Sequence, residues 1–411
     1  MKSYKYIIIG GGLAGGKAVD GIRQVDETGE VAVVTVEPHR PYERPPLSKD
    51  YLRGEAGLES VYVEDAAHYD AADAEILTGV RATRVIPDQR RVELEDGREL
   101  GYEKLLLATG GRAWRLPLPG NDLENVFTLR TIEDSDRIRE AAGEGAHALI
   151  MGGSFIGCEV AASLRQLGAQ VTMIFPESRL LERIAPAALG DLLFATYRDE
   201  GVNVFPGTVS EGLEGDGKVQ RAQLDNGKML EVDLVVMGVG IRLNTELADE
   251  AGLTLNERGA LIVDEHLRTS DPDIYGAGDI AAWPDPTFGE RLRVEHWDVA
   301  RRQGRQAGRN MAGEEVAYTA LPYFFSDLFD LSFEVWGNLN AWEETVVRGS
   351  PGKGSFAYYY FDGGRLVGVL SMGRPSSERK PMQELVKARV PYDDIAVDLG
   401  DESVDLDRIT H

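Results

Sequence analysis

The feature that most constrains this chain is an apolar strand that runs directly into a glycine-rich turn. Residues 4–10 read YKYIIIG, GGLAGG follows, and a helix is expected through Arg23. Gly10, Gly12 and Gly15 form the pattern G-x-G-x-x-G, and the next apolar strand, EVAVVTVE, ends at Glu37. In this context the glycines let a pyrophosphate approach the helix N-terminus, while the acidic residue hydrogen-bonds a ribose hydroxyl. The pattern predicts a dinucleotide-binding α/β unit.

A second copy of the same plan begins near residue 147. The stretch HALIMGGSFIGCEVAASLRQLG again sets a glycine turn between a strand and a helix, and QVTMIF is the next strand. Ser154 replaces the middle glycine, Phe175 replaces the strand-end acid, and Glu177 follows two residues later. A serine can still form the turn, although its side chain can alter how closely phosphates approach. We therefore expect a second, less regular dinucleotide site.

Both copies end in a hairpin that leads into an apolar strand. VELEDGREL precedes LLLATGG, and AQLDNGKML precedes LVVMGVG. Asp-Gly and Asn-Gly at the two tips favour two-residue turns with positive φ. The repeated plan predicts two sites of cofactor size.

The chain then returns to the first unit through TSDPDIYGAGDIAAW. A strand around Ile274 leads to Gly276, Gly278 and Asp279, and a short helix is expected next. Small residues there admit a ligand beside the backbone, and Asp279 is a candidate acceptor for polyol hydroxyls. A Gly-Asp pair at a strand end is also common in ordinary turns.

From about residue 320 the pattern changes to aromatic strands and hairpins, followed by a helix near residues 381–389. The predicted fold class is α/β, with two Rossmann-like dinucleotide-binding domains and a C-terminal α+β domain. The expected boundaries are 1–113 with 243–320 for the first domain, 114–242 for the second and 321–411 for the third.

Composition excludes several classes of function. The 411 residues carry 44 basic and 69 acidic side chains, a formal charge of −25 that argues against nucleic acid and anionic membranes as partners. The single cysteine, Cys158, excludes an intrachain disulfide, a CxxC pair and a cysteine-based zinc site, so no metal is expected. Without a membrane-length apolar run or signal-peptide features, a cytoplasmic location is expected.

The loop RPYERPPLSKDYL, residues 40–52, is unusually stiff for a connection that leaves a sheet. Its three prolines fix φ and restrict the residues before them. The loop is either a rigid surface connection or a preorganised support for Arg44 and Lys49.

Taken together, these segments resemble a known family over nearly the whole chain. The matching elements, in order, are GGGLAG, Glu37, RPYERPPLSK, LLLATGG, TLRT, GGSFIGCEVAA, GAGDIAA, VEHWDVA and FFSD. The set is similar to FAD- and NAD(P)H-dependent ferredoxin/putidaredoxin (rubredoxin) reductases, a group that includes apoptosis-inducing factor. The resemblance implies glutathione-reductase-like domains for FAD and NAD(P)H, with the C-terminal domain forming a floor below the flavin.

The resemblance also implies specific contacts with FAD. Lys49 would reach the flavin near N5, where an ammonium stabilises the negative charge of the reduced ring. Asp279 would hold the ribitol chain, and Trp297 would lie against the isoalloxazine. The full set on this side is Gly10, Gly12, Leu13, Ala14, Gly15, Glu37, Arg44, Lys49, Ala82, Ala108, Thr109, Gly110, Arg130, Gly278, Asp279 and Trp297.

On the coenzyme side, the resemblance implies contacts along the second glycine turn and beyond it. Glu159 would pair with Lys49, and these two residues with Trp297 are the expected catalytic groups. Glu177 would repel a 2′-phosphate whereas Arg179 and Arg183 could attract one, and we favour NADH over NADPH. The coenzyme set is Gly152, Gly153, Ser154, Phe155, Ile156, Gly157, Glu177, Arg183 and Gly240, with Glu295, His296 and Phe325 between the two cofactors. Phe325 stands where many relatives carry tryptophan.

Three functions remain open at this point. The leading hypothesis is a reductase that passes single electrons from NAD(P)H, through FAD, to a small iron–sulfur protein or rubredoxin, serving an oxygenase. The alternatives are a redox-responsive interaction protein like apoptosis-inducing factor, and a slow NADH oxidase. An acidic ferredoxin would need a local basic face, for which Arg301, Arg302, Arg305 and Arg309 on one expected helix are candidates, although they can equally be solvated charges. Cysteine-based disulfide chemistry is not expected, and both a monomer and a homodimer remain possible.

Overall fold

In the computed structural model, which describes residues 1–409, the first apolar segment is a buried parallel strand, β1 (Lys2–Ile9). It pairs on one side with β2 (Val31–Val34) and on the other with β6 (Glu99–Leu107). The sheet order is β3 (Ala74–Leu77), β2, β1, β6, β5 (Arg91–Leu94), β4 (Ala82–Ile86), and β18 (Ile274–Gly276) pairs with the carboxyl half of β6. All pairs except β4–β5 and β5–β6 are parallel, so the first glycine turn and Gly278 follow carboxyl ends at one edge of the sheet.

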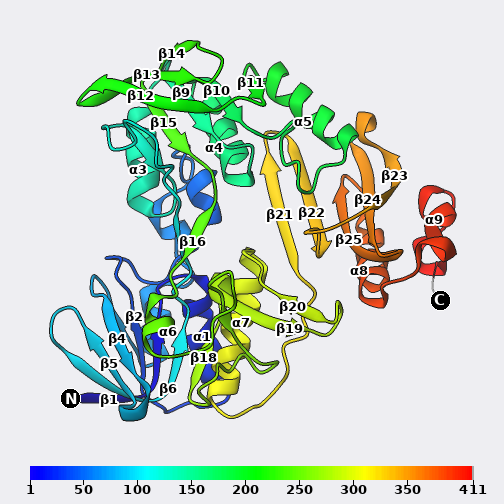
Figure 1. Cartoon of the computed structure of the whole chain (residues 1–411). Helices are drawn as coiled ribbons and strands as arrows, with labels where there is room; N and C mark the ends of the chain where they lie inside the picture. The colour runs from blue at the N-terminus through cyan, green and yellow to red at the C-terminus, as the bar shows by residue number, and fades with distance from the viewer. Residues whose placement is uncertain (410–411) are drawn as a thin grey trace. The chain divides into compact units, whose positions relative to one another are not determined.

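Two helices pack against each other beside this sheet, α1 (Leu13–Arg23) and α7 (Trp297–Met311) (Figure 1). Their approach is close because α7 presents glycines to the backbone of α1. A Cβ at Gly304 would overlap the carbonyl of Ala14, and one at Gly308 would overlap that of Ala18. These elements belong to a first compact unit, which comprises residues 1–44, 58–112 and 242–322. It also contains α2 (Ala66–Ala71), α6 (Glu246–Glu250), β17 (Leu261–Ile262), β19 (Ala281–Asp285) and β20 (Glu290–Leu292).

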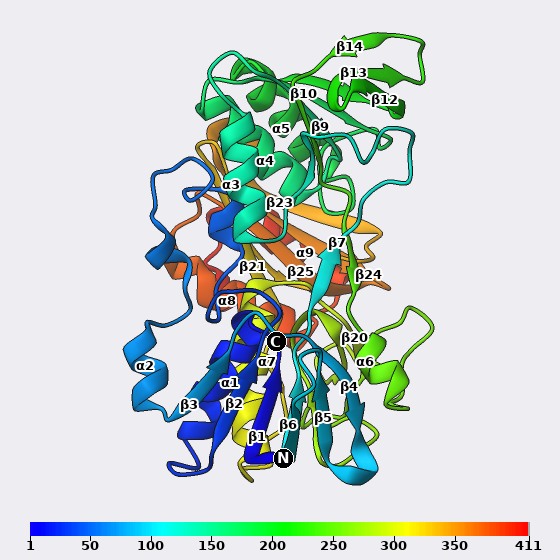
Figure 2. The same cartoon turned by 90° about the vertical axis from the view of Figure 1, so that its left-hand side faces the viewer.

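The second unit comprises residues 45–57, 113–241 and the chain from 323 onward. Its parallel sheet has the order β11 (Asn203–Pro206), β10 (Gln170–Phe175), β9 (His147–Met151), β15 (Leu234–Met237), β8 (Val126–Thr128). Helices α3 (Ile132–Ala141), α4 (Phe155–Gln166) and α5 (Ala187–Asp199) pack on its strands (Figure 2). An antiparallel hairpin sheet of β12 (Ser210–Asp216), β13 (Lys218–Leu224) and β14 (Met229–Glu231) adds a small core. Short strands β7 (Gly111–Ala113) and β16 (Ile241–Leu243) pair where the chain passes from one unit to the other.

The C-terminal part of the second unit is an antiparallel sheet with a core of aromatic side chains. Its order is β21 (Tyr323–Leu328), β22 (Leu331–Gly337), β25 (Arg365–Met372), β24 (Ser355–Asp362), β23 (Glu344–Ser350). Tyr359, Tyr360 and Phe361 in β24 are buried. Two helices follow, α8 (Arg379–Ala388) and α9 (Tyr392–Gly400) (Figure 2).

The predicted fold class is therefore confirmed, with two Rossmann-like sheets and a C-terminal α+β region. The three-domain boundaries stay a prediction. The segment 45–57, which carries Lys49, groups with the second unit although its flanks belong to the first. Within residues 1–409, no helix has the length and apolar character needed to cross a membrane.

Three local predictions need correction. Both hairpins form, but their loops have three residues, because Leu94 N–H bonds Arg98 O and Leu224 N–H bonds Lys228 O. Only the glycines at these tips adopt positive φ, so a type I turn followed by a left-handed glycine replaces the two-residue turn. The helix expected after Asp279 is one 3-10 turn, Gly278–Ile280, followed directly by β19. Helix α9 was not predicted.

Candidate active site

The first glycine turn has the geometry that a pyrophosphate requires. Gly10 has φ +133°, and a Cβ there would overlap the carbonyl of Ala108 at the end of β6. A Cβ at Gly15 would overlap the carbonyl of Gly10, whereas one at Gly12 would meet no atom of residues 1–409 within 4 Å. The outer two glycines therefore shape the turn, and the middle position leaves the N-terminus of α1 open to a phosphate.

The second turn has the same geometry, and its contacts show why Ser154 can replace the middle glycine. A Cβ at Gly152 would overlap the carbonyl of Gly238, and one at Gly157 would overlap that of Gly152. Ser154 Oγ donates to Gly238 O at 2.6 Å and accepts from Gly157 N at 3.2 Å, so it caps α4. The serine stands where the first turn has Gly12, whose position needs no glycine for steric reasons, so the departure from the pattern leaves the backbone of the turn unchanged.

The structure also explains why a phenylalanine, Phe175, stands at the strand end where an acid was expected. Its buried ring lies against the second turn, where a Cβ on Gly153 would come within 3.0 Å of it. Glu177, which follows β10, and Arg183 are both exposed. In the second copy the candidate acid, Glu177, therefore lies beyond the end of β10. Glu37 of the first copy likewise lies beyond the end of its strand, because β2 ends at Val34.

Glu37 sits in a small polar cluster built by the stiff loop. Tyr42 donates its hydroxyl to the Glu37 carboxylate, and Arg44 Nη2 lies 3.2 Å from Glu37 Oε1. Arg44 Nη1 also donates to the Tyr42 hydroxyl at 3.0 Å. Burial raises the pKa of Tyr42, so its proton stays on the hydroxyl. The loop thus fixes both the candidate ribose acid and a cation beside it. Ala82 is buried at the start of β4.

The carboxyl ends of β1, β6 and β18 meet around Ala14. A Cβ on Gly278 would lie 3.3 Å from Ala14 Cβ, so the Gly278–Asp279 turn lies directly beside the first glycine turn. Thr109, after β6, donates its hydroxyl to Asn244 O at 2.5 Å. Leu13 and Ala108 are buried at the same edge, Asp279 is half-buried, and Gly110 O accepts from Asn244 N–H.

Gln303 is a further candidate site residue, which the sequence did not reveal. Its buried side chain accepts the Gly278 N–H at Oε1, at 2.9 Å. Its Nε2 is also buried and has no hydrogen-bond partner in the described chain. A buried donor beside the cofactor turn fits a ligand with many acceptor oxygens, as FAD has.

Trp297, the first residue of α7, is held by Glu43 from the stiff loop. The indole N–H donates to Glu43 Oε2 at 2.9 Å, and the Arg301 guanidinium lies 5.0 Å from the ring centroid. Burial raises the pKa of Glu43 above its usual value, while the Trp297 bond opposes that shift. Burial lowers the pKa of His296 to about 4, so this histidine is neutral at pH 7. Glu295 is exposed and pairs with Arg293 at 2.6 Å.

Lys49 and Glu159 form an ion pair inside the second unit. Lys49 Nζ lies 2.6 Å from Glu159 Oε1, and the two side chains are only 14% and 7% exposed. Ser48 Oγ donates to Glu159 Oε2 at 2.6 Å, and Ser326 Oγ donates to Oε1 at 2.9 Å. Because the pair is nearly buried, removing one partner would leave an uncompensated charge.

The segment that carries Lys49 is tied to two helices by serine hydroxyls. Ser135 of α3 donates to Leu47 O at 2.9 Å, and Ser163 of α4 donates to Ser48 O at 2.6 Å. Arg139 adds a bond to Tyr51 O at 2.8 Å. The stiff loop is therefore more than a surface connection, since its backbone is fastened on both sides of Lys49.

The start of α4 and strand β21 carry the remaining coenzyme-side candidates. The Phe155 ring lies edge-on to Phe324 with centroids 5.1 Å apart. Ile156 and Phe325 are unusually exposed for large apolar side chains, at 40% and 38%. Trp342 donates its indole N–H to Arg183 O at 3.1 Å, which fixes the loop after β10. Gly240 follows β15, and Arg130 precedes the capping box that opens α3.

Comparisons with known proteins agree with this geometry. Residues 4–304 match the pyridine nucleotide-disulphide oxidoreductase family, and residues 323–410 match the reductase C-terminal family. The chain belongs to the pyridine nucleotide-disulphide oxidoreductases. As a member it is an NAD(P)H-dependent flavoprotein reductase, with FAD as its cofactor.

Three similar proteins illustrate the range of this family. The chain is 34% identical to the ferredoxin–NAD(+) reductase component of the anthranilate 1,2-dioxygenase system of Burkholderia cepacia, over 91% of this chain and 92% of that one. It is 34% identical to monodehydroascorbate reductase 3 of Arabidopsis thaliana, over 96% and 95%. The crystal structure of a covalent putidaredoxin reductase–putidaredoxin complex superimposes with a TM-score of 0.92 at 32% identity, covering 99% and 98% of the chains.

Cys158 lies in an environment that suppresses thiol chemistry. The thiol is fully buried at the start of α4, and burial raises its pKa to about 12. A thiol in that state is unreactive at neutral pH.

The four arginines of α7 that were candidates for a basic face all lie near carboxylates, and two of them share one. Arg301 and Arg302 both bind the buried Asp298, at 2.6 Å and 2.5 Å. Arg305 lies 3.7 Å from Asp20, and Arg309 pairs with Glu314. The helix surface of this reductase is therefore largely neutralised, which weakens the case for α7 as a docking face.

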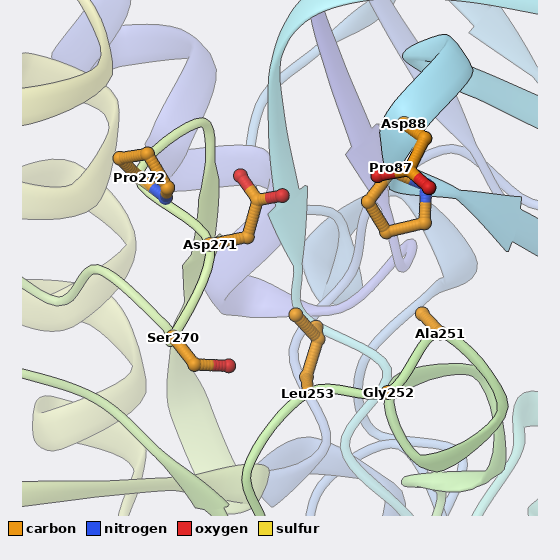
Figure 3. A pocket seen from close by; sticks show the side chains of 8 residues that line it. All are labelled: Pro87, Asp88, Ala251, Gly252, Leu253, Ser270, Asp271 and Pro272. Atoms are coloured by element: carbon orange, nitrogen blue, oxygen red, sulfur yellow. The ribbon is translucent and has the colours of Figure 1, made fainter.

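The first unit has a surface hollow of about 320 Å³ (Figure 3). It is lined by the turn after β4, by residues 251–253 and by residues 270–272. Residues 270–272 precede β18, whereas Gly278 and Asp279 follow its carboxyl end. Ligands of parallel sheets bind at the carboxyl ends of the strands, so the hollow is not the cofactor site.

Proposed function

We propose that this reductase takes hydride from NADH and delivers single electrons to a small iron–sulfur protein or rubredoxin. Two dinucleotide turns of matching geometry in one chain, together with a nearly buried Lys49–Glu159 pair in the second unit, are the main support. The names of two relatives, a ferredoxin–NAD(+) reductase component and a putidaredoxin reductase, point to the same class of acceptor. Service to an oxygenase in the cytoplasm is part of the proposal.

The first unit would hold FAD through its own groups. The open N-terminus of α1 receives the pyrophosphate, Glu37 binds the ribose, and Asp279 binds the ribitol chain. Arg44, beside Glu37, would lie toward the phosphates, and Trp297, fixed by Glu43, would pack against the ring. When bound, FAD supplies the conversion from a two-electron donor to one-electron transfers.

The second unit would hold the coenzyme and support the reaction. The N-terminus of α4 receives the coenzyme phosphates, and Phe155, Ile156 and Phe325 offer apolar surface. Lys49 provides a fixed ammonium for negative charge that develops during hydride transfer. Glu177 accepts a ribose hydroxyl and disfavours a 2′-phosphate, so we propose NADH as the preferred donor.

Anaerobic mixing of the FAD-loaded protein with NADH tests this proposal. The flavin absorbance should bleach within seconds, and NADPH should act more slowly. Cytochrome c reduction should then rise many-fold when a ferredoxin is added. A protein that binds FAD but is reduced by neither coenzyme would contradict the proposal.

A second acceptor follows from the similarity to a monodehydroascorbate reductase. Adding the monodehydroascorbate radical in place of ferredoxin measures this activity directly. A rate above that with ferredoxin would favour a small-molecule acceptor. Peroxide release that ferredoxin leaves unchanged would favour an oxidase, and NADH-dependent dimerisation with negligible turnover would favour an interaction protein.

A further inference from the structure

Ser326 is a buried serine in β21, whose other residues are aromatic or apolar apart from the exposed Asp327. Side chains alternate along a strand, so Phe324, Ser326 and Leu328 share one side while Phe325 faces the other. Phe324 packs on Phe155 at the start of α4, and Ser326 is 1% exposed. The same side therefore brings the Ser326 hydroxyl to Glu159, with Oγ 2.9 Å from Oε1.

The Glu159 carboxylate takes hydrogen bonds from groups on two other segments. Oε2 accepts from Ser48, while Oε1 accepts from both Lys49 and Ser326. With one serine at each oxygen, the carboxylate cannot rotate without losing a bond, so the direction of the Lys49 ammonium is fixed too. Deleting Ser326 frees the oxygen that Lys49 binds.

Packing alone does not account for a hydroxyl at this position. Strand β21 and the turn after it are already held by aromatic contacts, Phe155 with Phe324 and Tyr197 with Phe329, each with centroids 5.1 Å apart. A buried hydroxyl without a strong partner would be unfavourable here. Its partner is the carboxylate that the proposed function assigns to Lys49.

We propose that Ser326 is a positioning residue for flavin reduction, acting through Glu159 on Lys49. The proposal rests on the proposed roles of Lys49 and Glu159. It adds the C-terminal sheet to the reaction, since a strand of that sheet supplies the hydroxyl.

Anaerobic stopped-flow reduction by NADH tests the proposal with four variants. Ser326→Ala should lower the limiting rate of flavin reduction about 10-fold, the size expected for a hydrogen bond to a charged group. The apparent NADH affinity and the melting temperature should change little, because aromatic packing holds the strand. Ser326→Thr keeps the hydroxyl and should restore the rate to within about 2-fold. In the double variant Ser326→Ala/Glu159→Gln the flavin should be reduced no more slowly than in Glu159→Gln alone. Ser326 acts only through Glu159, so its loss has no further effect once Glu159 is changed.

Ser371→Ala is the matched control, since Ser371 is a buried serine in β25 of the same sheet. A wild-type rate in Ser326→Ala, multiplying effects in the double variant, or an equal loss in Ser371→Ala would each overturn the proposal. If Ser326→Ala does not fold, Ser326→Cys replaces it, and the weak thiol donor should also slow reduction.

Lys49→Met separates this proposal from the function it rests on. A slow Lys49→Met with a wild-type Ser326→Ala would overturn the Ser326 role alone. A wild-type rate in Lys49→Met would overturn the proposed role of Lys49, and the Ser326 role with it.

Discussion

The environment of Lys49 shows how neutral hydroxyls can set the direction of a charge. Four serines fix Lys49 indirectly. Ser48 and Ser326 donate hydrogen bonds to its partner Glu159, and Ser135 and Ser163 donate hydrogen bonds to the backbone just before it. Hydroxyls can do this without adding charge, so the ammonium keeps a single counterion in this cluster. Such preorganisation is what transition-state charge stabilisation needs.

Lys49→Met should therefore impair chemistry more than binding. We expect the limiting rate of flavin reduction to fall about 100-fold, the effect expected for one preorganised electrostatic group. FAD content should stay near that of the parent protein, as measured by absorbance and protein assay. Lys104→Met is the control, because Lys104 pairs with Asp273 near the start of β18. Equal losses of FAD and of rate in Lys49→Met would refute this role.

His296 predicts a specific pH dependence of stability. Its pKa is lowered by burial from 6.5 to about 4 in the folded state, and Asp279 and Asp298 only partly oppose this. Between these values the unfolded chain binds more protons, so stability is present above pH 6.5 and is lost as the pH falls toward 4. The change is on the order of 3 kcal/mol.

His296→Gln should flatten this dependence. The difference in urea midpoint between pH 7 and pH 4.5 should shrink in the variant, while the exposed histidine variant His147→Gln should behave as the parent. A variant whose midpoint falls as steeply as the parent's would show that other groups control this pH range.

Sequence reasoning named candidate site residues at this scale but not the residues that hold them in position. Glu43 binds Trp297, and Ser326 binds Glu159, across separations of 254 and 167 residues. Such pairs depend on which strands and helices become neighbours in the fold, and a local sequence pattern does not predict this. A lone serine within FFSD was the one visible signal.

At the level of elements, local sequence patterns predicted secondary structure correctly where a single steric requirement determines it. Both strand–turn–helix units formed because their outer glycines are required by backbone overlap. The hairpin tips were wrong by one residue, because Asp-Gly and Asn-Gly also suit three-residue loops, and register decides between the two. Helix α9 was missed because Ile395 and Leu399 are the only buried residues it contributes among those described.

Adding one methyl group at Gly304 of α7 should lower the unfolding free energy substantially. Gly304→Ala would drive a Cβ into the Ala14 carbonyl, and backbone on both sides cannot move aside as a side chain can. We expect a loss of about 3 kcal/mol in unfolding free energy and weaker FAD binding, because the glycine turn shifts with α1.

Gly190→Ala in α5 is the control for this change. Its Cβ would come within 2.8 Å of the flexible Arg179 side chain, which can rotate away. Denaturant unfolding should therefore show a small change, or a gain, for Gly190→Ala. A similar loss in both variants would mean that helix propensity or general crowding decides the result.

At the scale of the whole molecule, the formal charge of −25 governs long-range approach of a partner. The arginines of α7 offset it only weakly, because the four of them lie against three acids, Asp298, Asp20 and Glu314. An acidic ferredoxin should therefore be repelled before short-range contacts form.

The rate of ferredoxin reduction should accordingly rise with salt. Raising ionic strength from about 0.01 M to 0.15 M shortens the screening length from about 30 Å to about 8 Å. At limiting ferredoxin the bimolecular rate should increase over this range, while reduction of a neutral quinone should stay constant. A steep fall with salt would reveal a basic docking face elsewhere on the protein.

Segment 45–57 has a consequence for protein engineering. Exchanging residues 113–241 between relatives, to transplant coenzyme preference, would separate Glu159 from its side-chain partners Ser48 and Lys49, and Ser135 and Ser163 from the backbone that they bind. Chimeras should therefore carry 45–57 along with the transplanted segment, and strand β21 with both. Hybrids made at the apparent boundaries alone would inherit a nucleotide site whose lysine belongs to another protein.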